Sequence, residues 1–318
     1  MSKKDDITKA YMSDPTTFAD MFNAYLYEGR RVIDSTQLEE LDPTEIADLM
    51  KLTIDKAEMD PLQKHRDVLK KMCVMTDQKN TYVLLGIENQ THIDRTMPVR
   101  VMLYDAIRYL QQFKDIASKN KHDKKTGIDH LSGVATDDTI CPIITLVINF
   151  DSKKWNQPTT LHELFEDDSQ IRNLLRFVPN FQMNLFDPHA VNKEDFDAFQ
   201  TALKQIFKYI KFANDKNALK QIVHEDPAYT DMDVTSAKVI DVVTGSNLRN
   251  LPKEGKVNMC KAIEDMIKEG KLEGKLEGKL EVKLEIALNM LNAGMEVELI
   301  AQVTGLSPEE VLNLKNNA

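Results

Sequence analysis

The sequence is poor in cysteine and lacks any long apolar segment. Its three cysteines, Cys73, Cys141 and Cys260, are scattered without C-x-x-C spacing, so we expect reduced thiols and no zinc site. No run of about 18 or more apolar residues occurs, so we expect no membrane span. The polar start of the chain, residues 1–6, is not followed by an apolar segment. We therefore expect no secretory signal and a cytoplasmic protein.

The chain also has no net positive charge: its formal net charge is −10 at pH 7. Taken alone, this value argues against a nucleic-acid partner. The charge is unevenly distributed, however. Residues 60–125 contain four Arg and nine Lys against seven Asp and one Glu, which makes this segment +5. A basic segment inside an acidic protein is compatible with contact to a phosphate backbone, although a solvated loop at residues 119–125 would explain much of the same excess.

The most informative pattern is a predicted β-hairpin. Residues 68–76 and 81–90 are rich in β-branched and apolar residues, and residues 77–80 have the composition of a turn. A turn centred between Gln78 and Lys79 places Asp67 opposite Gln90 and diagonal to Glu88. Side chains alternate between faces, so all three share one face. Two adjacent carboxylates repel each other unless a cation lies between them, and oxygen ligands suit Mg²⁺.

These residues resemble the PD-(D/E)xK nuclease superfamily, and more closely its Rpn family (recombination-promoting nucleases and transposases, YhgA-like). That family has an Asp, then E-x-Q, then M-P-x-R-x-x-x-Y. The matching residues here are Asp67, Glu88-Asn89-Gln90 and Met97-Pro98-Val99-Arg100 with Tyr104. Further matches begin at Phe22-Asn23, resume at Pro142-Ile143-Ile144 and end in the Gly-Lys-Leu-Glu repeats of the tail, so the resemblance covers almost the whole chain.

The resemblance implies a metal-dependent DNA endonuclease that is linked to recombination or mobile-element-like activity. Asp67 and Glu88 would be carboxylate ligands of Mg²⁺, for which Mn²⁺ can substitute, and the main-chain carbonyl of Asn89 would be a third ligand. Gln90 stands where the wider superfamily has Lys; its amide can orient water but supplies no positive charge. Glu28, near the end of a predicted helix, is a candidate additional acid. The alternative is a catalytically degenerate nuclease fold that acts as a DNA-binding or oligomeric scaffold.

A helix is predicted from about Met97 to Phe113. We expect Val101, Leu103, Ala106 and Leu110 to contribute to its buried side. A polar stripe at helical spacing, which begins with Arg100 and Tyr104 and continues through Arg108 and Gln111, has two interpretations. Arg100 and Tyr104 could contact a DNA backbone beside the metal. Alternatively, the stripe is a solvated face, or Arg100 pairs with the acids of the core.

The remaining pattern predicts an α/β fold: a restriction-endonuclease-like core with a mixed β-sheet flanked by helices, plus a helical extension and a helical C-terminal tail. Residues 140–150 have the nearly continuous apolar character of a buried strand. Trp155, the single tryptophan, is interpreted as a packing anchor. We expect the core at residues 1–160, the helical extension at 161–250 and the tail at 251–318.

In the tail, Gly-Lys-Leu-Glu repeats three times from Gly270. A period of four places Lys above Lys and Glu above Glu, which disfavours an isolated helix, so we expect either a helix that needs a partner or a flexible linker. Short helices follow, and Ser307-Pro308-Glu309-Glu310 predicts a capping box. Their arrangement suggests a helix-turn-helix, but the acidic residues around it favour an oligomerisation module instead. DNA and a second copy of the chain are the expected partners.

Overall fold

The computed structural model describes residues 3–41, 68–76, 79–248 and 251–317. The chain folds into two compact units. The first contains residues 1–247 and 251–259, and the second contains residues 248–250 and 260–318. Among the described residues, no helix combines the length and the apolar character that crossing a membrane requires.

The first unit is built on a five-stranded mixed sheet with strand order β1-β2-β3-β4-β5. The strands are Glu39–Glu40, Val68–Thr76, Lys79–Gln90, Ile143–Asn149 and Asn184–Phe186. The first three strands pair antiparallel, and β3, β4 and β5 pair parallel. The predicted mixed sheet is therefore confirmed, and so is the predicted buried strand, because β4 is buried from Thr145 to Asn149.

The predicted hairpin forms, but its predicted register is wrong by two residues. Thr76 pairs with Lys79 and Val68 with Ile87. Only two residues separate the strands, because Lys79 and Asn80 belong to β3 and not to a four-residue turn. Two-residue connections are the commonest in β-hairpins. A shift of two residues preserves the faces, so Glu88 and Gln90 still share one side of the sheet. Asp67 itself lies outside the described residues.

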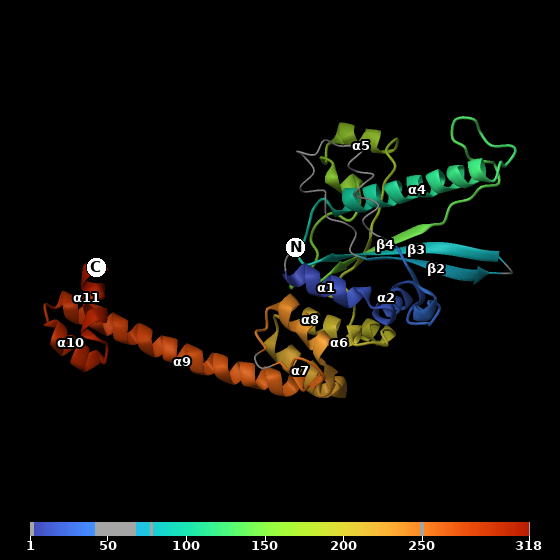
Figure 1. The fold of residues 1–318 in the computed structure, drawn as a ribbon. Helices are drawn as coiled ribbons and strands as arrows, with labels where there is room; N and C mark the ends of the chain where they lie inside the picture. The colour runs from blue at the N-terminus through green and yellow to red at the C-terminus, as the bar shows by residue number, and fades with distance from the viewer. Residues whose placement is uncertain (1–2, 42–67, 77–78, 249–250, 318) are drawn as a thin grey trace. The chain divides into compact units, whose positions relative to one another are not determined.

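Helices cover both faces of the sheet (Figure 1). Helix α4, Met97–His122, lies on one side, where Thr145 of β4 donates to Asp105 of α4 over 2.6 Å. On the other side lie α1 (Lys3–Ser13), α2 (Pro15–Tyr27), α6 (Leu203–Phe212) and α8 (Val234–Thr244). There the buried Lys70 of β2 donates to the main-chain oxygen of Ser13 over 2.9 Å. This α/β/α layering, consistent with a restriction-endonuclease-like fold, buries both faces of the central strands.

Residues 161–250 contribute more than the predicted helical extension. Helices α5 (Ser169–Leu175), α6, α7 (Lys216–Glu225) and α8 are present, but β5 adds a strand to the core sheet. Aromatic rings join this region to the sheet: the Phe207 ring lies 5.7 Å from that of Phe150 and 4.8 Å from that of Phe186, between centroids. A three-residue strand is too short for periodicity to reveal, which explains why the sequence pattern indicated only helices.

The described residues of the second unit form three helices: most of α9 (Met259–Asn292), then α10 (Val297–Thr304) and α11 (Pro308–Asn317). The Gly-Lys-Leu-Glu repeat lies inside α9, so it is helical and not a linker. A small core of Ala287, Ile300, Leu306 and Val311 holds the three helices together. The predicted capping box is confirmed, because Ser307 N donates to Glu310 Oε2 over 2.7 Å and Glu310 N donates to Ser307 Oγ over 3.2 Å.

Candidate active site

The C-terminal end of β3 carries the candidate catalytic residues into the middle of the sheet. Glu88, Asn89 and Gln90 are 1%, 5% and 9% exposed. Glu88 pairs with Val147 and Gln90 with Asn149 on the parallel strand β4. Alternation places Glu88 and Gln90 on the side covered by α4 and the Asn89 side chain on the opposite side. A glutamate this deeply buried requires a compensating charge or ion.

Arg100 of α4 supplies that charge. Its Nη2 lies 3.8 Å from Oε2 of Glu88, and its Nη1 donates to Oδ2 of Asp94 over 2.9 Å. Burial alone would lower the pKa of Arg100, but Tyr104, Glu88 and Asp94 outweigh burial and the net pKa is raised. The guanidinium carbon also lies 6.0 Å from the centroid of the Tyr104 ring. Arg100 is therefore a permanent cation against Glu88.

Asp94 belongs to the same charge cluster at the start of α4. Burial would raise the pKa of Asp94, but the main-chain N–H and the hydroxyl of Thr96, together with Arg100, hold it below its usual value. Two carboxylates, Glu88 and Asp94, thus flank one guanidinium. Arg100 therefore contacts one carboxylate on the sheet and one at the start of α4.

The polar stripe of α4 faces inward, contrary to the predicted inner side. Arg100, Tyr104 and Arg108 are 7%, 2% and 6% exposed, whereas Leu110 is 60% exposed and Ala106 is also exposed. Val101 is buried as expected and Leu103 is half-buried. The helix turns this way because it covers the part of the sheet that carries Glu88, Gln90 and Thr145, so polar side chains find their partners there.

Two expectations for α4 thus have different outcomes. Helical spacing did group the stripe correctly, and the interpretation of Arg100 as a partner of a core acid agrees with the distances. Contact of Arg100 and Tyr104 with a DNA backbone stays a prediction. Gln111, the last member of the stripe, donates to Asp115 on the same helix over 2.8 Å.

The second predicted carboxylate ligand, Asp67, is outside the described residues. Its neighbour Val68 is the first residue of β2 and pairs with Ile87, which directly precedes Glu88. In the described part of the chain, no group of three or more His, Cys, Asp or Glu residues could hold a metal ion. Glu28 is exposed and ends α2 with φ 54°, where its N–H donates to Asn23 O. It functions there as a helix terminus.

Sequence reasoning missed a hydrogen-bonded cluster beside Gln90. Asn149, the β4 partner of Gln90, donates from Nδ2 to Asp187 Oδ1 over 3.0 Å. Asp187 Oδ2 accepts from the main-chain N–H of Trp155 over 2.9 Å. Asn149 is the last residue of β4, and Asp187 directly follows β5. Polar residues at the carboxyl ends of parallel strands are a signal that could have identified both. Trp155 is a packing anchor as predicted, in a cluster with Met97, Val101, Val147 and Met183.

Comparison with known families accounts for most of the chain. Residues 2–232 match the family model described as "Putative transposase, YhgA-like". Residues 280–316 match the model of the C-terminal HTH domain of the Rpn/YhgA-like nuclease family. No curated protein and no solved structure matches the chain.

The second match corrects an expectation from the sequence. An oligomerisation module was preferred there to a helix-turn-helix, but residues 280–316 match a helix-turn-helix domain. The acidic residues around α10 and α11, such as Glu298 and Glu309, are exposed and do not determine the fold. The buried residues Ala287, Ile300, Leu306 and Val311 do, because they join the three helices.

Proposed function

This chain belongs to the YhgA-like transposase family and ends in the helix-turn-helix domain of Rpn/YhgA-like nucleases, and from this membership we propose that it is a metal-dependent DNA endonuclease. The proposal gives the chain phosphodiester hydrolysis on DNA, in recombination or in mobile-element-like activity. The single observation that carries it is the buried Glu88 at the end of a central strand, 3.8 Å from Arg100 and beside Gln90.

The donor set fits a hard divalent cation. Its members include the Glu88 carboxylate, which is buried at the end of β3, and the adjacent main-chain carbonyl of Asn89, and both are oxygen ligands. Asp67, Glu88 and the main-chain carbonyl of Asn89 would hold Mg²⁺ or Mn²⁺. When bound, the ion would polarise the scissile phosphate and lower the pKa of a coordinated water.

The residues of the chain itself have separate tasks in this proposal. Arg100 positions the Glu88 carboxylate and supplies a positive charge 3.8 Å from it, since the pKa of the arginine itself is raised. Gln90 orients the attacking water or a phosphate oxygen through its amide. Since an amide supplies no positive charge, the enzyme depends more on its metal than a nuclease with Lys at this position would.

The experiment that tests the proposal is cleavage of supercoiled plasmid by the full chain. Nicking should occur with Mg²⁺ or Mn²⁺ and stop when a chelator removes the ion. The alternative function is a degenerate nuclease fold that serves as a DNA-binding scaffold, in which the Arg100–Glu88 ion pair is only structural. Plasmid that is retarded in a gel but never cut, with either ion, would establish the scaffold and contradict the nuclease.

Substitution of Gln90 should change the cleavage rate but not the affinity for metal. Gln90→Ala should lower the nicking rate by about 100-fold, the lower end of the effect of losing one positioned hydrogen-bond donor, and leave Mn²⁺ affinity unchanged. Gln90→Lys should keep or raise the rate at neutral pH, since it adds the missing positive charge. Calorimetry with Mn²⁺ provides the control. A loss of affinity in Gln90→Ala would show that the side chain is a ligand and not an orienting group.

We also propose that the second unit binds DNA and joins two copies of the chain. The helix-turn-helix match supports the first role. Exposed apolar side chains along α9 support the second: Leu272 is 59% exposed, Leu280 47%, Val282 54% and Ile286 43%. Lys and Glu columns that repel within one helix can pair between two helices. A dimer would place two single-strand-cutting sites on one duplex.

Removing the tail from Met266 onward should therefore give a monomer that nicks plasmid but rarely linearises it. Light scattering measures the mass per particle, and gel electrophoresis measures the ratio of nicked to linear product. The double variant Leu272→Lys, Leu280→Lys retains the buried core of the helix-turn-helix (Ala287, Ile300, Leu306 and Val311) and should also be monomeric. An unchanged mass per particle, in chain equivalents, for both variants would contradict self-association through α9.

A further inference from the structure

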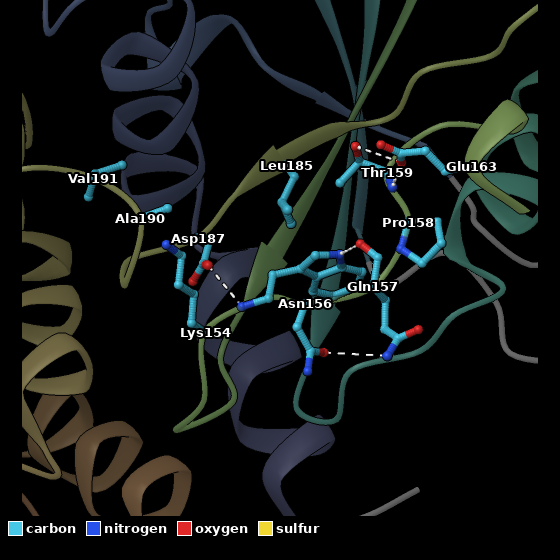
Figure 2. A pocket seen from close by; sticks show the side chains of 11 residues that line it. Lys154, Asn156, Gln157, Pro158, Thr159, Glu163, Leu185, Asp187, Ala190 and Val191 are labelled. Atoms are coloured by element: carbon cyan, nitrogen blue, oxygen red, sulfur yellow. Dashed lines mark hydrogen bonds between the residues drawn. The ribbon is translucent and has the colours of Figure 1, made fainter. Parts of the chain in front are cut away.

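A hollow of about 570 Å³ lies in the first unit at the carboxyl ends of β4 and β5. Figure 2 shows Ala190 and Val191 on one side of it and Pro158, Thr159 and Glu163 on the other, with Leu185 between them. Its volume is within the range of about 300–1,000 Å³ that is usual for small-molecule sites. The carboxyl ends of parallel strands are also the usual location of ligand sites in open α/β sheets.

The acids that line the hollow are occupied by the protein itself. Glu163 accepts from the main-chain N–H groups of Thr159 and Thr160, over 2.7 and 3.0 Å, and these bonds lower its pKa. Asp187 accepts from Trp155 N over 2.9 Å and from Asn149 over 3.0 Å. Both carboxylates of the hollow are thus engaged by N–H donors of the protein itself.

The remaining polar groups have a different chemistry. Lys154 is exposed at the hollow and forms no ion pair within the described residues. Asn156 and Gln157 add two amides, connected by one long hydrogen bond of 3.4 Å. Pro158, Leu185 and Val191 supply apolar walls. Amides can read the edge of a base, apolar walls accept its faces, and a lysine attracts its phosphate.

We propose that this hollow binds one unpaired nucleotide of the DNA strand. The inference rests on the proposed function and extends it, because it specifies that the substrate is at least locally single-stranded. The hollow is connected to the candidate active site by two routes. Trp155 in its wall packs in one cluster with Met97 and Val101, which flank Arg100 on α4. Asp187 is bonded to Asn149, the strand partner of Gln90.

The first test measures binding of a fluorescent single-stranded oligothymidylate by anisotropy, with the full chain and a chelator present. Lys154→Ala should weaken binding and reduce the slope of log affinity against log salt by about 0.7, the value for one lost phosphate contact on a single strand. Lys153→Ala is the matched control, because Lys153 is the adjacent exposed lysine and does not line the hollow. Equal slopes for the two variants would overturn the proposal.

A second pair of variants fills the hollow without altering charge. Ala190→Phe places a ring in it from an exposed position, and should weaken oligothymidylate binding by about tenfold, the effect of losing one base contact. Ala228→Phe, at an exposed site that does not line the hollow, should bind normally. Equal affinities in this pair would also overturn the proposal.

The single tryptophan gives an independent signal. Trp155 Nε1 donates to Gln157 O over 2.8 Å, so an occupant that contacts Gln157 should change its fluorescence. Oligothymidylate should produce the change in the native chain and not in Ala190→Phe. If thymidine monophosphate binds as tightly as the oligonucleotide, the proposal that the occupant belongs to a DNA strand is contradicted. Because the binding assays contain a chelator, they do not depend on cleavage. A chain that binds oligothymidylate in these assays but never cuts plasmid with Mg²⁺ or Mn²⁺ would count against the proposed nuclease activity and leave the nucleotide site intact.

Discussion

Glu88→Gln should abolish metal-dependent nicking, with a loss of more than about 100-fold, because several kcal/mol of metal-derived transition-state stabilisation depends on this ligand. Asp67→Asn should have the same effect. Both substitutions preserve side-chain shape and remove only the charge. The rates are measured on supercoiled plasmid with Mg²⁺ and with Mn²⁺, under conditions in which enzyme exceeds DNA.

The matched control is Glu39→Gln, the same substitution on the edge strand β1, where Glu39 is exposed and pairs with Lys71 over 3.3 Å. This variant should retain native activity. Thermal unfolding should show Glu88→Gln and Asp67→Asn to be folded, with Asp67→Asn equally or more stable than the native chain without metal, since it relieves carboxylate repulsion. Full activity in either carboxamide variant would refute its assignment as a metal ligand.

Arg100→Met should lower the free energy of unfolding by about 3–5 kcal/mol, because it leaves the buried Glu88 carboxylate without its cation. Arg100 and Glu88 are 7% and 1% exposed, so solvent cannot replace the lost interaction. Adding Glu88→Gln to Arg100→Met should recover part of this loss. Urea unfolding of the native chain, both single variants and the double variant gives the coupling energy directly.

Arg95→Met provides the control, because Arg95 is an exposed arginine two residues before the start of α4. It should change stability by no more than about 0.5 kcal/mol, as surface substitutions usually do. The cycle also separates the contribution of Glu88 from that of Asp94. The Asp94–Arg100 contact is lost in both variants that carry Arg100→Met, so its loss cancels in the coupling energy. Additive effects of Arg100→Met and Glu88→Gln would show that the 3.8 Å pair contributes nothing to stability.

The alternation of residues correctly predicted which side chains of the hairpin share a face. The register of the hairpin was predicted from the composition of the turn, and that prediction was wrong. Alternation at residues 68–90 placed Glu88 and Gln90 together, and the structure agrees. The register depended on the turn, where Lys79 and Asn80 were assigned to the loop by composition. Composition cannot distinguish a two-residue connection from a four-residue one when the flanking residues tolerate both conformations.

The orientation of α4 was missed because periodicity analysis assumes that the apolar side is the buried side. Here the helix covers Glu88, Gln90 and Thr145, so its arginines and Tyr104 are buried and Leu110 is exposed. The buried Glu88 determines which residues of α4 face inward. Glu88 belongs to β3, so the periodicity of the α4 segment alone does not contain this signal. Strand β5 and Asp187 were missed for a related reason, since both depend on pairing with β4.

The most direct measurement of the central claim is diffraction from crystals of the full chain grown with Mn²⁺, using the anomalous signal of manganese. We predict one ion within coordination distance of the Glu88 and Asp67 carboxylates, on the α4 side of β3, and no ion at this position in crystals of Glu88→Gln. An anomalous map without a peak beside Glu88, in crystals of a chain that cleaves plasmid with Mn²⁺, would contradict the account.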